Sequence, residues 1–162
     1  MKLLATDMDG TFLRDDKSYS EEFNDLYNQM LKQGIQFVIA SGNQYEALVC
    51  KFDDDIKDDL YYLCENGTKI VYQGKTLYKK ALKKEDAKEI LDILKQDQEC
   101  MLVVSGDKHA YISKSFEDKK DFISLFMKNV QFVESYDDIE DDILKFSIAS
   151  FDDQMEQRIE KI

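Results

Sequence analysis

The residues with the clearest chemical meaning are two aspartates two positions apart, Asp7 and Asp9, which follow an apolar run that begins at Leu3. Carboxylates this close at a strand end bind a hard divalent cation well, and one can attack phosphorus while the other moves protons. Gly10 permits close backbone approach, and Thr11 offers a hydroxyl and an N–H group to phosphate oxygens. The pattern indicates phosphoryl chemistry, and its alternative is a solvated acidic turn.

A second polar segment, Ser41 to Asn43, follows another apolar run. A hydroxyl and backbone N–H groups at the start of a helix form a cradle for an anion. Taken alone, the segment reads as an ordinary helix N-cap. It gains meaning from Asp7 and Asp9, because the two segments would meet if the strands before them were neighbours.

A helix is predicted between the two apolar runs. Ser18 or Ser20 can cap its start, and apolar residues recur at helical spacing from Phe23 to Leu31. Gly34 is a natural residue for its end. The helix therefore has one apolar face with which to cover a sheet.

The two apolar runs, Leu3 to Met8 and Ile35 to Ala40, are predicted to be buried strands, and Gln44 to Phe52 a second helix. Strand, helix, strand and helix in so short a span form a βαβ unit with a parallel sheet. Asp7 and Ser41 would then lie at the same carboxyl edge, where open α/β sheets bind ligands.

The pattern changes near residue 83. Residues 1–82 continue with short strands, whereas residues 83–162 mix helices and strands as in an α+β module. We therefore predict an α/β fold in two parts, 1–82 and 83–162. The further elements expected are a strand over 60–64, a hairpin over 69–79, helices over 85–95 and 116–128, strands on both sides of Gly106-Asp107 and near Val130 and Phe146, and the start of a helix at Asp153.

Composition limits the partners of this chain. Lys and Arg number 22 against 34 Asp and Glu, a net charge of −12. This charge repels nucleic acid, and phosphate chemistry on the chain would need a metal cation, local lysines or N–H groups. Three widely spaced cysteines predict neither a disulfide framework nor a zinc site and fit the reducing cytoplasm. No run could span a bilayer, so no membrane partner is expected.

The motifs resemble those of the haloacid dehalogenase (HAD) superfamily. Residues 7–13 look like its motif I, residues 40–43 resemble motif II, and residues 65–68 look like the segment after the third core strand in the Cof subfamily. The part after residue 83 is similar to the α/β cap, type C2B, of that subfamily. The resemblance implies the N-terminal part of a Rossmann-like parallel sheet followed by a partial α+β cap.

The resemblance also implies a function, a Mg²⁺-dependent phosphatase that hydrolyses small phosphorylated metabolites, such as sugar phosphates, through a phosphoaspartate. Asp7 would be the nucleophile and Asp9 the general acid and base. The Asp7 carboxylate and the Asp9 backbone carbonyl would hold Mg²⁺. The residues expected to bind the phosphoryl group are Gly10, Thr11, Ser41 and Gly42.

The sequence departs from the family pattern in two ways. Asn43 stands where the family usually has Arg, which removes a cation near the site. The motif III Lys and the motif IV acidic pair have no counterpart after residue 83, since Lys145 falls in a predicted cap strand and residues 152–153 lack the family context. We therefore expect a chain that is truncated within the cap.

Three alternatives follow from these departures. The chain is a phosphatase of the Cof type, with its activity in the absence of motifs III and IV left open, or it is a non-catalytic remnant with a weak metal or phosphate site. A signalling receiver domain would need its acceptor aspartate at the end of a later strand, so Asp7 on the first strand argues against it. A sheet without strands beside the first one is also expected to self-associate through its exposed edge.

Overall fold

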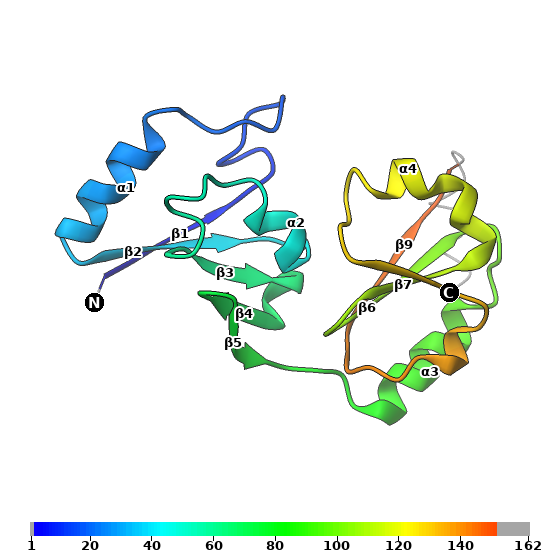
Figure 1. The fold of residues 1–162 in the computed structure, drawn as a ribbon. Coiled ribbons are helices and arrows are strands. Elements are labelled where there is room, and N and C mark those ends of the chain that lie inside the picture. Colours follow the sequence, from blue (N-terminus) through cyan, green and yellow to red (C-terminus); the bar gives the residue numbers. More distant parts are fainter. Residues whose placement is uncertain (1, 152–162) are drawn as a thin grey trace. The chain divides into compact units, whose positions relative to one another are not determined.

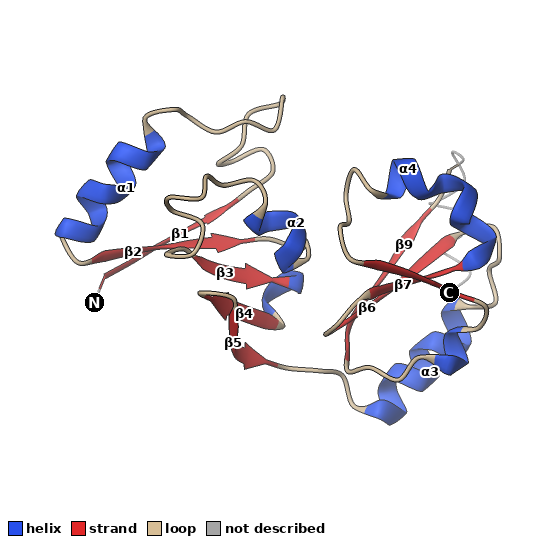
Figure 2. Ribbon diagram, viewed as in Figure 1, coloured by secondary structure: helices blue, strands red, loops and turns tan. Residues whose placement is uncertain are grey.

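The computed structural model describes residues 2–151, and the helix expected from Asp153 lies outside them. The chain divides into two compact units, one reaching to Lys80 and the other starting at Ala81. Each unit contains its own sheet, accompanied by helices (Figures 1 and 2). The predicted α/β fold class is confirmed.

The sheet of the first unit has five strands in the order β1-β2-β3-β4-β5 (Figure 1). β1 (Lys2–Asp7), β2 (Ile35–Ala40) and β3 (Tyr61–Cys64) are parallel, as the βαβ pattern predicts. β4 (Lys69–Tyr72) and β5 (Lys75–Lys79) form the predicted antiparallel hairpin.

β1 is an edge strand, and the prediction that it is buried is wrong. Among the described residues it pairs with β2 alone. Leu3 is 61% exposed and Leu4 is 44% exposed, although Met8, just beyond the strand, is fully buried. An apolar run indicates what a strand can bury but does not show how many neighbours it has, so it cannot separate an interior strand from an open edge.

α1 (Phe23–Lys32) packs on the sheet through Phe23, Tyr27 and Met30. It begins later than a cap at Ser18 or Ser20 would give, because the Phe23 N–H donates to the Ser20 carbonyl at 2.9 Å and so closes a turn before the helix. The predicted end of the helix is confirmed, since Gly34 has a φ of +69°.

α2 (Tyr45–Val49) is shorter than the helix predicted over 44–52. After Val49 the backbone tightens into turns that span three residues, with Lys51 N–H donating to the Leu48 carbonyl at 3.0 Å. These turns bring the Phe52 ring into an aromatic core with Phe12 and Phe23. The early end of the helix therefore serves the packing of the first unit.

The second unit begins with α3 (Lys84–Leu94) and contains four strands in the order β8-β7-β6-β9 (Figure 1). All residues of the central strand β6 are buried. Met101 and Val103 join one apolar cluster, whereas Leu102 and Val104 join another. The strands are β6 (Met101–Gly106), β7 (Ala110–Ser113), β8 (Val130–Val133) and β9 (Ile143–Ala149), of which β7 and β8 are parallel.

The continuous helix predicted over 116–128 does not form. The segment is a 3₁₀ helix (Lys114–Lys119) followed by the short α4 (Lys120–Ile123). The Ser113 hydroxyl accepts a hydrogen bond from the Ser115 N–H at 3.3 Å and starts the tighter 3₁₀ turn. Within residues 2–151, no helix is both long enough and apolar enough to cross a bilayer.

The Asp141 carboxylate joins the turn between β6 and β7 to β9 of the second unit. One of its oxygens, Oδ2, accepts from the Tyr111 hydroxyl at 3.0 Å and from the Lys108 N–H at 2.9 Å. Burial and the hydrogen bond to Asp141 raise the pKa of Tyr111 to about 12. A Cβ atom on Gly106 would lie 2.2 Å from the same Asp141 oxygen, so any larger residue there would force the carboxylate to move.

Candidate active site

Three strand ends of the first unit meet at the carboxyl edge of its sheet. Asp7, at the end of β1, is paired with Ala40 at the end of β2, and Ala40 is paired in turn with Leu63 of β3. The segments that follow these strands are the loop from Met8, the turn 41–43 and the 3₁₀ turn 65–67. Parallel pairing thus brings both sequence motifs to one edge, with the third segment beside them.

Asp9 lies at the centre of this group of side chains. Its Oδ1 is 2.8 Å from the Lys17 Nζ, and its Oδ2 is 3.5 Å from the Asn43 Nδ2. The Lys17 hydrogen bond and charge, together with the charge of Lys51, hold the pKa of Asp9 below its ordinary value, against the opposite effect of burial. Asp9 is therefore ionised at neutral pH and links the two motif segments.

The Asp7 side chain is placed differently. It is exposed, and the structure gives it no hydrogen bond or ion pair with any other residue between 2 and 151. Its backbone carbonyl is held by the Phe12 N–H at 3.2 Å and by the Thr6 hydroxyl at 3.0 Å. The backbone of Asp7 is thus fixed, and its carboxylate remains available as a nucleophile or a metal ligand.

The turn after β2 is braced by the segment after β3. The Ser41 hydroxyl accepts from the Asn43 N–H at 3.1 Å, and the Ser41 carbonyl accepts from the Asn66 N–H at 3.2 Å. A Cβ on Gly42 would lie 2.6 Å from the Asn66 Oδ1, so the close approach explains a glycine at this position. The Ser41 hydroxyl hydrogen remains able to donate to an anion.

The backbone is strained in the segment after β3 that holds this turn. Glu65 and Asn66 have φ values of +51° and +58°, and Gly67 follows at +88°. Left-handed conformations are costly for residues with a Cβ and cluster at functional sites. Residues 65–67, which the sequence singled out only through the family resemblance, therefore have a physical role, because they hold the turn 41–43 in place.

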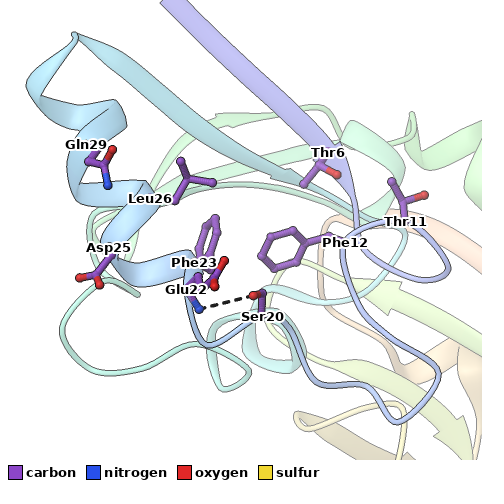
Figure 3. Close-up of a pocket in the computed structure, with 9 residues that line it drawn as sticks. All are labelled: Thr6, Thr11, Phe12, Ser20, Glu22, Phe23, Asp25, Leu26 and Gln29. Atoms are coloured by element: carbon purple, nitrogen blue, oxygen red, sulfur yellow. Dashed lines mark hydrogen bonds between the residues drawn. The ribbon is translucent and has the colours of Figure 1, made fainter.

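Gly10 and Thr11 lie in the loop after β1. Gly10 has a φ of +73°, which suits a glycine, and the Thr11 N–H donates to the Met8 carbonyl at 3.5 Å, the limit of a hydrogen bond. The Thr11 side chain lines a pocket of about 600 Å³ between β1 and α1 (Figure 3). The centroids of the Phe12 and Phe23 rings, which also line it, are 4.7 Å apart. This pocket, lined by aromatic and polar side chains together, borders the loop and does not include Asp7 or Asp9.

Lys17 and Lys51 are the site residues that sequence reasoning missed. Neither belongs to a motif, and only the structure shows that their charges act on Asp9. The nearest signal in the sequence was a single Lys after Asp15 and Asp16, in the loop that follows motif I.

The donor set suits Mg²⁺ only in part. No group of three or more His, Cys, Asp and Glu side chains in the described part of the chain is arranged to hold a metal ion. Mg²⁺, however, often binds through one or two carboxylates, several waters and the phosphate of its substrate. The unpaired Asp7 carboxylate and the Asp9 backbone carbonyl are hard oxygen donors of this kind.

Known hydrolases resemble this chain over almost its whole length. The profile of the haloacid dehalogenase-like hydrolases matches residues 4–162. The 5-amino-6-(5-phospho-D-ribitylamino)uracil phosphatase YbjI of Escherichia coli is 35% identical over 159 residues, which cover 97% of this chain. These residues make up 58% of the length of YbjI.

Solved structures show the same fold. The SMU.1108c protein of Streptococcus mutans matches with a TM-score of 0.84 and 28% identity over 99% of this chain. A haloacid dehalogenase-like hydrolase of B. subtilis matches with a TM-score of 0.79 and 19% identity, also over 99% of this chain. The match covers 61% of the first protein and 66% of the second, so this chain spans about three fifths of such relatives.

Proposed function

The chain belongs to the haloacid dehalogenase-like hydrolase family, and from this we propose that it hydrolyses phosphate monoesters of small metabolites through a phosphoaspartate on Asp7. The observation that carries the proposal is the contrast between its two carboxylates. Asp7 is exposed and unpaired within the described residues, whereas Asp9 is held in an ion pair with Lys17 at 2.8 Å. One carboxylate is thus ready to attack, and the other is positioned for proton transfer.

The proposed reaction has two steps. An Asp7 oxygen attacks phosphorus, the bond to the ester oxygen breaks, and the leaving alcohol takes a proton from Asp9. Asp9 then removes a proton from a water molecule, which attacks the phosphoaspartate and releases phosphate and free Asp7. Asp9 is ionised in the resting site, so it must take up a proton from solvent as the substrate binds before it can act as the acid. Proton removal from water in the second step returns Asp9 to that protonated state for the next turnover.

The phosphoryl group would be bound by Gly10, Thr11, Ser41 and Gly42. The Ser41 hydroxyl accepts from the Asn43 N–H, which positions the oxygen, and its own hydrogen can donate to a phosphoryl oxygen. The Asp7 carboxylate and the Asp9 carbonyl would hold Mg²⁺, which when bound neutralises charge on the phosphoryl oxygens. Positioning and charge neutralisation carry most of the catalysis in phosphoryl transfer.

The substrate class is proposed from the relative and the second unit. YbjI is named for a substrate with a phosphorylated ribityl chain, which supports a small sugar or polyol phosphate here. We assign residues 1–82 to the core and residues 83–162 to a partial C2B-type cap. The three cysteines are free thiols, which agrees with a reducing cytoplasm.

The test compares the chain with its Asp7→Asn variant on p-nitrophenyl phosphate, with and without Mg²⁺. We expect Mg²⁺-dependent hydrolysis that the variant loses, because an amide cannot act as the nucleophile. Equal rates in the two proteins would refute the role of Asp7. The second candidate is binding of metal or phosphate without turnover. It rests on the described residues containing no group of three or more metal-ligating side chains, and it predicts binding with no hydrolysis.

A further inference from the structure

The loop that carries Lys17 is a tight, fully bonded turn. The Arg14 N–H donates to the Ser18 carbonyl at 2.8 Å, and the Lys17 N–H donates to the Arg14 carbonyl at 2.9 Å. The Asp16 carboxylate accepts from both the N–H and the hydroxyl of Ser18, at 2.9 and 2.6 Å. The backbone of Lys17 is therefore fixed by its neighbours.

This turn holds Lys17 in an unfavourable conformation, with a φ of +66°. Glycine or asparagine normally occupies such a position, because a Cβ makes left-handed backbone costly. The chain places glycine at Gly10, Gly34 and Gly74, where φ lies between +67° and +73°. Gln73, in the turn between β4 and β5, is also left-handed, so the conformation alone assigns no role; at Lys17 the side chain leaves this turn and reaches the Asp9 carboxylate at 2.8 Å.

The ion pair that Lys17 forms with Asp9 contributes little to the stability of the fold. The Lys17–Asp9 pair is 2.8 Å long, but its side chains are 60% and 50% exposed. Exposed ion pairs contribute little to stability, because water screens the charges and both side chains lose freedom. The pair does hold an ammonium group against the carboxylate that follows Asp7 by two residues, at the edge where the phosphoryl group is proposed to bind.

We propose that Lys17 is a phosphate-binding residue, whose ammonium group lies on Asp9 in the resting site and moves to the oxygens of a phosphoryl group bound at Asp7. The inference rests on the proposed function and deepens it. With a net charge of −12, the chain repels phosphate unless positive charge is supplied locally. Position 43 carries an uncharged asparagine, so the cation that contacts the site carboxylates comes from the loop after β1.

The test measures binding of inorganic phosphate in the presence of Mg²⁺ by ³¹P NMR titration. Lys17→Met is expected to weaken binding about tenfold, the effect of losing one charge-assisted hydrogen bond. Lys17→Arg keeps the charge and should stay within about threefold of the parent. Lys57→Met is the matched control, because Lys57 also pairs with an aspartate, Asp54, but lies outside the site.

A third variant separates binding from structure. Lys17→Gly removes the side chain and relieves the left-handed strain, so its unfolding temperature should equal or exceed that of the parent while its phosphate affinity falls as in Lys17→Met. Phosphate binding by Lys17→Met that equals the parent's overturns this inference alone. Absence of saturable binding by the parent itself overturns the proposed phosphate site as well, so the two failures are distinguishable.

Discussion

Replacing Gly106 by alanine is expected to destabilise the second unit by about 2 to 4 kcal/mol. The new Cβ would lie 2.2 Å from the Asp141 Oδ2 and 2.9 Å from a Tyr111 ring carbon, so the carboxylate must move. Movement breaks its hydrogen bonds to the Lys108 N–H and the Tyr111 hydroxyl. Hydrogen bonds to a charged acceptor contribute about 1.5 to 3 kcal/mol each, and local shifts recover part of the loss.

The assay is urea unfolding followed by circular dichroism, with a double-mutant cycle. If the clash acts through Asp141, the double variant Gly106→Ala/Asp141→Ala should cost no more than the larger single change. Gly74→Ala is the control, because its Cβ meets nothing within 4 Å and only its φ of +67° opposes the change. Additive effects of Gly106→Ala and Asp141→Ala, or a cost for Gly106→Ala no larger than that of the control, would refute the reasoning.

Three further predictions concern the edge, the tyrosines and the site. Leu3→Lys should reduce self-association measured by sedimentation velocity, whereas Leu125→Lys, on a still more exposed leucine of the second unit, should not. Association unchanged by Leu3→Lys would argue against β1 as the interface. Burial raises the pKa values of Tyr27 and Tyr111 to about 12, so the native state retains protons that the unfolded chain loses above pH 10. The contribution of these two tyrosines to the free energy of unfolding should be constant below pH 10 and fall between pH 10 and 12, and a flat unfolding profile between pH 10 and 12 contradicts both shifts. Asn43→Arg adds a cation beside Asp9 and should tighten phosphate binding by about three- to tenfold in the same ³¹P titration, and weaker binding would count against a phosphate at this edge.

The sequence predicted most of the first unit, because its signals are local. Apolar runs, the helical spacing from Phe23 onward and the glycine at 34 define β1, α1 and β2, and the short βαβ span requires parallel pairing. From that pairing alone, Asp7 and Ser41 could be placed on one edge. The observed register, with Asp7 opposite Ala40, has this arrangement.

The errors arise where a local pattern depends on distant neighbours. Leu3 and Leu4 are apolar, yet their exposure is decided by whether another strand pairs with β1. The segment 116–128 has helical spacing, but Ser113 starts a 3₁₀ turn, and only Ile123 among its residues is fully buried. The spacing of apolar residues does not show that a side-chain hydrogen bond favours a 3₁₀ turn over an α-helix.

The position of Lys17 could not be predicted for a related reason. No spacing rule connects residue 17 with residue 9, because the contact depends on a turn whose left-handed residue is a lysine rather than a glycine. Sequence rules assign glycine to such positions, so an exception is visible only in the structure. Of the four exceptions among the described residues, Lys17, Glu65 and Asn66 lie in segments that follow strands of the candidate site, whereas Gln73 lies in the turn between β4 and β5.

The division of the chain at Lys80 has a consequence for synthesis on the ribosome. Every residue assigned to the candidate site, from Asp7 to Gly67, belongs to the first unit, whose core uses only its own side chains. Domains generally fold as units, with the N-terminal one first as the chain emerges. The proposed nucleophile Asp7, the Asp9–Lys17 ion pair and the turn 41–43 would therefore be assembled on the nascent chain before the second unit has fully emerged.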